Sequence, residues 1–186
     1  MKTSQKTRQR ILAAAKTAFA KWGYDSASMS IIARQAKVDK SSLYYFFKSK
    51  DDLFAAITLD TWQQLSKAVA KNLGNTKRSN PQQALSQTCQ EFIKISLAAG
   101  MSTTKMELPR TDHPHFIETM EIINQTQKQA LNFLKKHLVK YPNEARSLIA
   151  NSVHGYVLHS CSGKHQPSIK NYCDYLSALI IKPKKN

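Results

Sequence analysis

Glycine, proline, cysteine and acidic residues are all scarce in this chain of 186 residues. Five glycines and six prolines leave little material for turns, which favours a helical chain with few, short loops. The three cysteines are widely spaced and form no CxxC pair, which indicates free thiols in a reducing compartment. No apolar signal core and no run of about 18 uncharged apolar residues is present, so we expect a cytoplasmic protein without membrane spans.

The shortage of acids leaves a strongly basic chain. Lys and Arg number 28 against 12 Asp and Glu, a formal net charge of +16. Residues 1–50 hold 11 of the basic residues and only two acids, so the first quarter of the chain is the most charge-dense. Such a field suggests a polyanionic partner, either nucleic acid or an anionic membrane surface, although a basic face that is simply solvated gives the same composition.

Apolar residues at steps of three and four predict an all-α fold of about nine helices. Ser28, Asp39 and Ser49 are suited to cap helix starts, and Ser49 with Asp52 has the form of a capping box. The predicted helices span residues 4–23, 28–37, 40–46, 50–73, 82–98, 101–108, 115–140, 143–162 and 168–181.

The two short helices at 28–37 and 40–46 have the dimensions of a helix-turn-helix, whose second helix needs one core face and one DNA face. At 100° per residue, Leu43, Phe46 and Phe47 fall on one side of the second helix. Tyr44 and Tyr45 fall on the opposite side. The aromatic pair without polar atoms therefore points inward and the pair with hydroxyls points outward.

These residues carry a resemblance to the TetR family of bacterial transcription regulators, over residues 8–54. The matching features are R-x-x-I-L-x-A-A from Arg8 to Ala15, Phe19, Gly23-Tyr24, Ser28, Ile32-Ala33, Ala36, Val38, Leu43-Tyr44 and Phe47 to Leu53. The resemblance implies a DNA-binding domain at 1–49 and a helical ligand-binding and dimerisation domain at 50–186. It also implies a homodimer on a roughly palindromic operator, acting as a repressor that a small-molecule effector releases, without a cofactor.

Carried over position by position, the resemblance assigns base and phosphate contacts to one set of residues. They are Ser28, Lys37, Lys40, Ser41, Ser42, Tyr44, Tyr45 and Lys50. Each has an ordinary structural alternative, since the tyrosines can pack against neighbouring helices and the lysines can be solvent charges.

Three positions depart from the family pattern or leave it open. Lys37 stands where the family often has Gly, so the turn is either less comfortable or gains a phosphate contact. Phe46 replaces a Tyr or His, which removes a phosphate hydrogen bond. Ser41 is small and polar, so the sequence alone gives no base preference there.

The last two predicted helices resemble the dimer interface of the family, although their apolar faces can also be ordinary core. The expected interface residues are Leu148, Ile149, Ser152, Val153, Tyr156, Tyr172, Leu176 and Leu179. A ligand pocket is expected among the helices between about 50 and 140. Its candidate lining is Trp62, Phe92, Met101, Met106, Phe116, Met120 and Tyr156, each of which is individually more typical of core.

Other function classes have weaker support. His113 and His115, and separately His154, His159, Cys161 and His165, are not spaced as a metal site, so we expect none. No catalytic constellation is present, and we expect no enzyme. A DNA binder of this fold acting as an activator or architectural protein is the main alternative. A membrane-surface protein would need the apolar face of the first helix, which the DNA-binding head uses.

Overall fold

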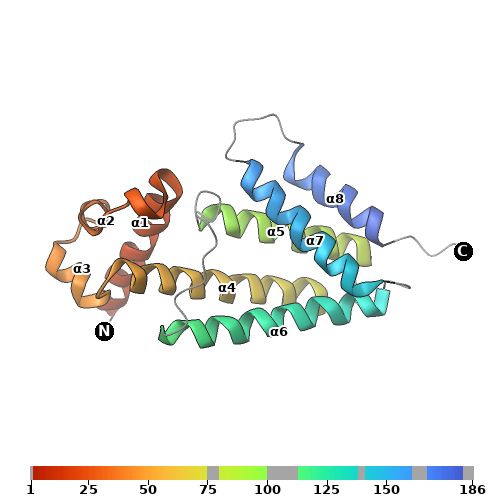
Figure 1. Cartoon of the computed structure of the whole chain (residues 1–186), viewed down its shortest axis with the longest axis horizontal. Coiled ribbons are helices and arrows are strands. Elements are labelled where there is room, and N and C mark those ends of the chain that lie inside the picture. The colour runs from red at the N-terminus through yellow and green to blue at the C-terminus, as the bar shows by residue number, and fades with distance from the viewer. Residues whose placement is uncertain (1, 75–79, 100–112, 138–140, 161–166, 182–186) are drawn as a thin grey trace, which may run out of the picture. The chain divides into compact units, whose positions relative to one another are not determined.

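The computed structural model describes residues 2–74, 80–99, 113–137, 141–160 and 167–181 (Figure 1). Within those ranges all regular structure is helical, which confirms the all-α prediction. Eight of the nine predicted helices are present, and the ninth, at 101–108, lies outside the described residues. The helices are α1 Lys2–Ser26, α2 Met29–Ala36, α3 Lys40–Phe46, α4 Lys50–Gly74, α5 Pro81–Ala98, α6 Pro114–His137, α7 Pro142–His159 and α8 Ile169–Ile180.

The chain forms two compact units. The first comprises Met1–Trp62 and Ser96–Met120, and the second comprises Gln63–Ile95 and Glu121–Asn186. The units divide the chain by packing, whereas the expected boundary between residues 49 and 50 divides it by function. That functional boundary therefore stays a prediction.

The first unit contains the head, formed by α1 to α3 and the start of α4. Its core is built from buried side chains at helical spacing on α1, together with three from α2, three from the start of α4, and Leu43 and Phe47 from α3 and its end. Ile11, Phe19, Ile32, Leu43 and Phe47 are the largest of them. Burial of each such side chain stabilises the head by about 1.5–3 kcal/mol, so four short segments hold one another in place.

Gly23 interrupts α1 where the sequence predicts that the helix ends. Its φ of 75° and ψ of 168° are outside the helical region, and a short helical stretch continues to Ser26 beyond this kink. A side chain is rarely tolerated at such a φ, which explains why glycine occupies the position. The kink lets Tyr24 turn back and pack its ring against those of Phe19, in a tilted contact, and Phe54, edge to face, with centroids 5.5 and 5.2 Å away.

The second unit packs α5 against α7 and α8 around a small apolar core that includes Cys89, Ile93, Val153 and Cys173. Burial raises the pKa of both cysteine thiols to about 12, so neither is a nucleophile near neutral pH. Cys161 lies outside the described residues.

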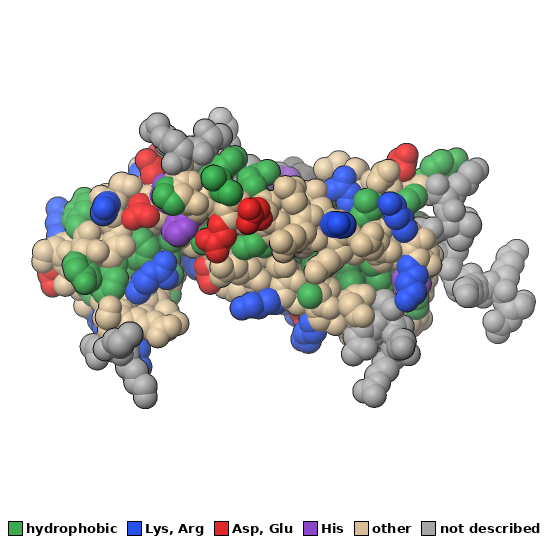
Figure 2. Space-filling model, turned by 90° about the horizontal axis from the view of Figure 1, so that it is seen from below, with side chains coloured by type: hydrophobic (Ala, Val, Ile, Leu, Met, Phe, Trp, Pro, Cys, Tyr) green, Lys and Arg blue, Asp and Glu red, His purple; other side chains and the backbone are tan. Residues whose placement is uncertain are grey.

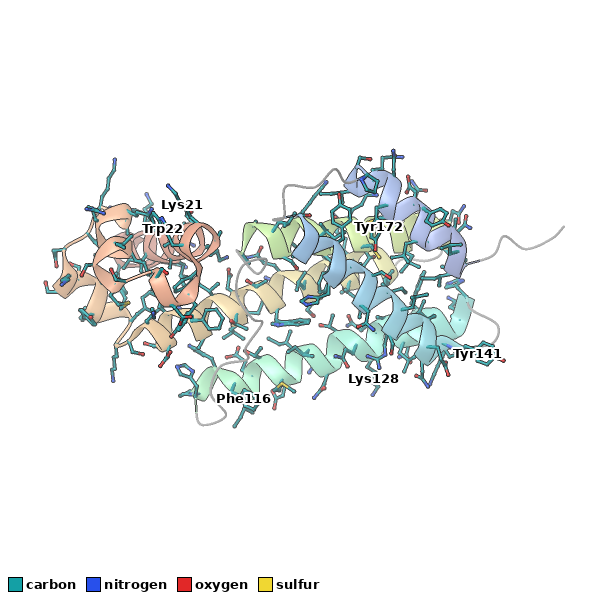
Figure 3. All side chains as sticks on the ribbon, turned by 45° about the horizontal axis from the view of Figure 1, so that its top comes forward. Lys21, Trp22, Phe116, Lys128, Tyr141 and Tyr172 are labelled. Carbon is teal, nitrogen blue, oxygen red and sulfur yellow. The ribbon has the colours of Figure 1, made fainter. Side chains whose placement is uncertain are left out.

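Hydrogen bonds fix the order of the helices in this unit. Ser86 on α5 donates its hydroxyl to Asp174 on α8 at 2.6 Å. Tyr172 lies between α7 and α8, as Figure 3 shows, and donates its hydroxyl to the carbonyl of Ser152 at 2.8 Å. These polar contacts link α8 to both α5 and α7, and thereby determine which sides of α7 and α8 stay outside.

Candidate nucleic-acid interface

The turn between α2 and α3 is held in the left-handed conformation at Lys37, with a φ of 52°. The turn is closed by its own backbone, since Lys37 N–H donates to Arg34 and Val38 N–H donates to Ala33. Arg10 on α1 adds a second closure, because its Nη2 donates to the carbonyls of Ala36 at 2.6 Å and Lys37 at 2.8 Å. This guanidinium contact offsets the strain of a side chain at a position where glycine is easier.

The side chains of α3 divide as the helical wheel predicts. Leu43 is fully buried, and Phe47, just beyond the helix, is buried as well. Tyr44 and Tyr45 are 46% and 81% exposed. Phe46 is half-buried, packs against the head core and meets the Tyr45 ring edge-on at 5.2 Å. One side of α3 therefore anchors the helix, and the other presents two phenols to the outside.

Asp39 caps α3 and also holds the first two serines of the helix. Its carboxylate accepts hydrogen bonds from the Ser42 amide at 2.6 Å, the Ser41 hydroxyl at 2.5 Å and the Ser42 hydroxyl at 2.8 Å. The Ser41 hydroxyl, followed by the amide and hydroxyl of Ser42, holds the pKa of Asp39 far below its usual range. The carboxylate is therefore ionised near neutral pH.

The start of α2 is capped in the same way. Ser28 is exposed, and its hydroxyl oxygen accepts from the Ile31 amide at 3.3 Å. Lys37, Lys40 and Lys48 are exposed around the helix-turn-helix. These side chains and the outward face of α3 together form a basic, hydroxyl-rich surface, which we call the α3 surface.

Lys50 is engaged within the head. Its Nζ donates to the carbonyl of Tyr24 at 2.9 Å and to that of Asp25 at 3.3 Å, and it lies 4.3 Å from the centroid of the Tyr24 ring. The Tyr24 hydroxyl in turn bonds to Asp51. Lys50 thus ties the first turn of α4 to the end of α1, a role that the sequence did not indicate.

One half of the predicted capping box is present at the start of α4, and its returning hydrogen bond is shifted by one residue, from Ser49 to Lys48. Ser49 accepts from the Asp52 amide at 3.0 Å, and the Asp52 carboxylate accepts from the Lys48 amide at 3.0 Å. His113, immediately before α6, adds its Nε2 at 3.5 Å from the same carboxylate. The connection from α3 to α4 is therefore fixed by short polar contacts, which sets the direction of α3 relative to the core of the head.

The expected interface residues on α7 and α8 fall into two groups. Leu148 and Leu179 are 52% and 57% exposed, whereas Val153 and Leu176 are buried within the second unit. Ile149, Ser152, Tyr156 and Tyr172 are half-buried. Tyr175, which the sequence reading omitted, is 67% exposed. Exposed apolar side chains from both helices thus remain on the outside of this unit.

The expected pocket residues are divided between the two units. Trp62, Phe116 and Met120 belong to the first unit, whereas Phe92 and Tyr156 belong to the second, and all five are half-buried. Met101 and Met106 lie outside the described residues. A cavity of about 340 Å³ lies within the second unit, between α4 and α6. It is lined by Val69, Ala70, Leu73, Gly74, Gln129, Asn132, Phe133 and Lys136, none of which the sequence reading selected.

Among the residues that the structure describes, no group of three or more His, Cys, Asp or Glu is arranged to hold a metal ion. None of the helices that the structure describes is long and apolar enough to cross a membrane. On the face drawn in Figure 2, Lys and Arg side chains lie among acidic and apolar ones rather than in one continuous patch.

A capped helix, a tight turn and a second helix with one buried and one exposed side make the head a helix-turn-helix DNA-binding domain. Residues 11–57 match the family model described as bacterial regulatory proteins, tetR family. The match assigns the head, residues 11–57, to the bacterial regulatory proteins of the tetR family.

Curated relatives match only part of the chain. The uncharacterised helix-turn-helix-type transcriptional regulator YhgD of Bacillus subtilis is 43% identical over 47 residues, which cover 25% of each chain. The alignments span a quarter to a third of the length of the curated relatives that the chain matches.

Solved structures match nearly the whole chain in fold. FadR of Bacillus subtilis, solved in complex with stearoyl-CoA, has a TM-score of 0.72 and 17% identity, over 94% of this chain and 97% of that one. AibR, solved with isovaleryl coenzyme A and operator DNA, has a TM-score of 0.76 and 14% identity, over 95% and 99%. At these identities the likeness concerns the fold.

Proposed function

We propose that the protein is a homodimeric transcriptional repressor that binds a roughly palindromic operator and leaves it when a small molecule binds. The observation that carries this proposal is the α3 surface, where exposed phenols, serines and lysines stand on a helix whose other side is buried in the head. Such a helix fits the major groove, and the basic first quarter of the chain supplies attraction to phosphates.

Within that proposal the contacts divide into two kinds. Lys40, Ser41, Ser42 and Tyr44 are the candidates for base edges and adjacent phosphates. Ser28, Lys37 and Tyr45 are candidates for phosphates, which position the head without reading sequence. Lys50 is the weakest candidate, because two backbone carbonyls already take hydrogen bonds from its ammonium group.

We assign dimerisation to α7 and α8. Leu148, Tyr175 and Leu179 are large apolar or aromatic side chains that the monomer leaves exposed, and burying such groups is the usual driving force for association. The functional boundary between residues 49 and 50 then separates the DNA-binding part from the part that dimerises and receives the effector.

The effector class follows from the structural neighbours rather than from this chain. Two proteins of the same fold were solved with acyl-coenzyme A molecules, stearoyl-CoA in one and isovaleryl-CoA in the other. We therefore take these two compounds as the first probes for release from DNA. The site of action is the cytoplasm, where the operator is found.

The test is a selection of duplexes from a random-sequence pool by the full-length protein, followed by a gel-shift titration. We expect an enriched sequence with two related half-sites, bound by a dimer, and release by an effector. A protein that enriches no duplex is not a sequence-specific DNA binder. A footprint upstream of the promoter rather than over it would favour the alternative, an activator.

A further inference from the structure

The hydroxyl protons of Ser41 and Ser42 are both committed to one carboxylate. Ser41 Oγ lies 2.5 Å from Asp39 Oδ1, and Ser42 Oγ lies 2.8 Å from Asp39 Oδ2. An ionised carboxylate is an acceptor only, so each serine is necessarily the donor in its pair. Hydrogen bonds to a charged acceptor are also stronger than neutral ones, which makes these two difficult to exchange for others.

A serine hydroxyl has one proton and two lone pairs. Because Asp39 takes the proton in both cases, the lone pairs are what the serines offer to a molecule that approaches α3. Ser41 is exposed and Ser42 half-buried, so both oxygens lie at the edge of the α3 surface. This end of the recognition helix therefore presents acceptors, with a carboxylate directly behind them.

Acceptors discriminate among the groups of DNA. Phosphate oxygens, guanine N7 and O6, and thymine O4 are acceptors themselves and repel such an edge. The major-groove donors are the exocyclic amino groups, adenine N6 and cytosine N4. We propose that Ser41 and Ser42 accept hydrogen bonds from adenine or cytosine amino groups, and that Asp39 sets this preference as a positioning residue.

The inference rests on the proposed function, in which α3 faces the major groove. The proposed function left open whether Ser41 and Ser42 contact bases or phosphates. This inference assigns both serines to bases. It also predicts that each operator position that a serine contacts accepts two bases, adenine or cytosine, on the contacted strand.

The test begins with the operator that the wild-type protein selects. Each adenine is replaced singly by purine and each cytosine by 2-pyrimidinone, which lack the amino group. Loss of one hydrogen bond is expected to weaken binding about 2- to 10-fold at one or two positions per half-site. In Ser41→Ala or Ser42→Ala the same replacement costs nothing at the matching position, because the acceptor is already gone.

Asp39→Asn tests the origin of the preference. Asparagine is an equally good helix cap, and its amide nitrogen donates where the carboxylate accepted, which frees a serine proton. We expect its selected pool to admit guanine or thymine at the positions that the serine variants identify. A pool identical to that of the wild type contradicts the role of Asp39.

Gln87→Ala, at an exposed position of α5, is the matched control. Each removal of an amino group from the operator should weaken its binding as much as it weakens binding of the wild type. Thermal unfolding of each variant confirms that it is folded. If removal of the amino groups weakens binding equally in the wild type and in both serine variants, the inference is wrong, while the DNA-binding function stands. Failure of the wild type to select any duplex instead refutes the proposed function.

Discussion

The α3 surface and the outer side of α7 and α8 are both exposed, but they are built from opposite chemistry. The α3 surface consists of hydroxyls and lysines, and hydrogen bonds to Asp39, Ser28 and Arg10 fix its backbone. The outer side of α7 and α8 carries Leu148, Tyr175 and Leu179. A surface that meets DNA has to hold polar atoms at fixed positions, whereas a surface that meets another copy needs mainly apolar area.

The difference also explains why the two regions match other proteins differently. The family model matches residues 11–57, within the head, and one relative is 43% identical over 47 residues. FadR and AibR, in contrast, are only 17% and 14% identical over almost the entire chain. Caps, a left-handed turn and inward aromatics each demand particular residues at particular positions. Helix packing in the second unit demands only apolar volume at helical spacing, which many sequences supply.

The largest expected effect separates the two sides of α3. Leu43→Ala should lower the free energy of unfolding by about 2–5 kcal/mol, because it leaves a cavity in the head core. Tyr44→Ala should leave stability within about 0.5 kcal/mol and weaken operator binding instead. Chemical denaturation and gel-shift titration of both variants provide the measurements. A large stability loss in Tyr44→Ala would assign that ring to the core.

The next largest effect is expected on the outer side of α7 and α8. Leu179→Arg should weaken self-association about 100-fold, since the leucine's burial is lost and a charge takes its place. Sedimentation equilibrium measures the change, with Gln87→Arg, at an exposed position of α5, as the control. Equal association of the two variants would move the dimer contact away from this part of α8.

A smaller effect on stability and on DNA binding should distinguish Lys50 from Lys48. Lys50→Ala should cost about 1 kcal/mol of stability, because it removes the bonds to the Tyr24 and Asp25 carbonyls. Lys48→Ala should leave stability unchanged and reduce the salt slope of DNA binding by about one unit. Denaturation and binding across a salt series decide between them. A full unit of slope lost in Lys50→Ala, with unchanged stability, would restore it as a phosphate contact.

The smallest effect is at the turn. Lys37→Gly should raise the free energy of unfolding by about 0.5–1 kcal/mol, because glycine adopts the left-handed conformation without strain. Its DNA affinity separates the two readings of Lys37: unchanged affinity leaves it a solvent charge, and a weaker, less salt-dependent complex makes it a phosphate contact. Arg34→Ala, also exposed, serves as the comparison.

Local rules predicted the features that depend on neighbours in sequence. The caps at Ser28, Asp39 and Ser49 occur where expected, and the two sides of α3 follow from a period of 3.6 residues. These interactions span four residues or fewer, so sequence spacing alone defines them.

Contacts between distant residues were not predictable in the same way. Arg10 reaches the turn 26 and 27 residues later, and Lys50 reaches back to the end of α1. Long side chains find such partners only after the helices have packed, and nothing in their spacing marks them. On α7 and α8, apolar residues occur on more than one side of each helix, so periodicity did not separate the buried Val153 and Leu176 from the exposed Tyr175.

The link between Arg10 and the turn has a consequence for sequence variation. The guanidinium and the left-handed backbone at Lys37 support each other, so tolerance of a side chain at position 37 depends on what stands at position 10. Across relatives, the two positions should covary. Chains with glycine in the turn should be free to lose the arginine, and chains with a side chain there should keep it.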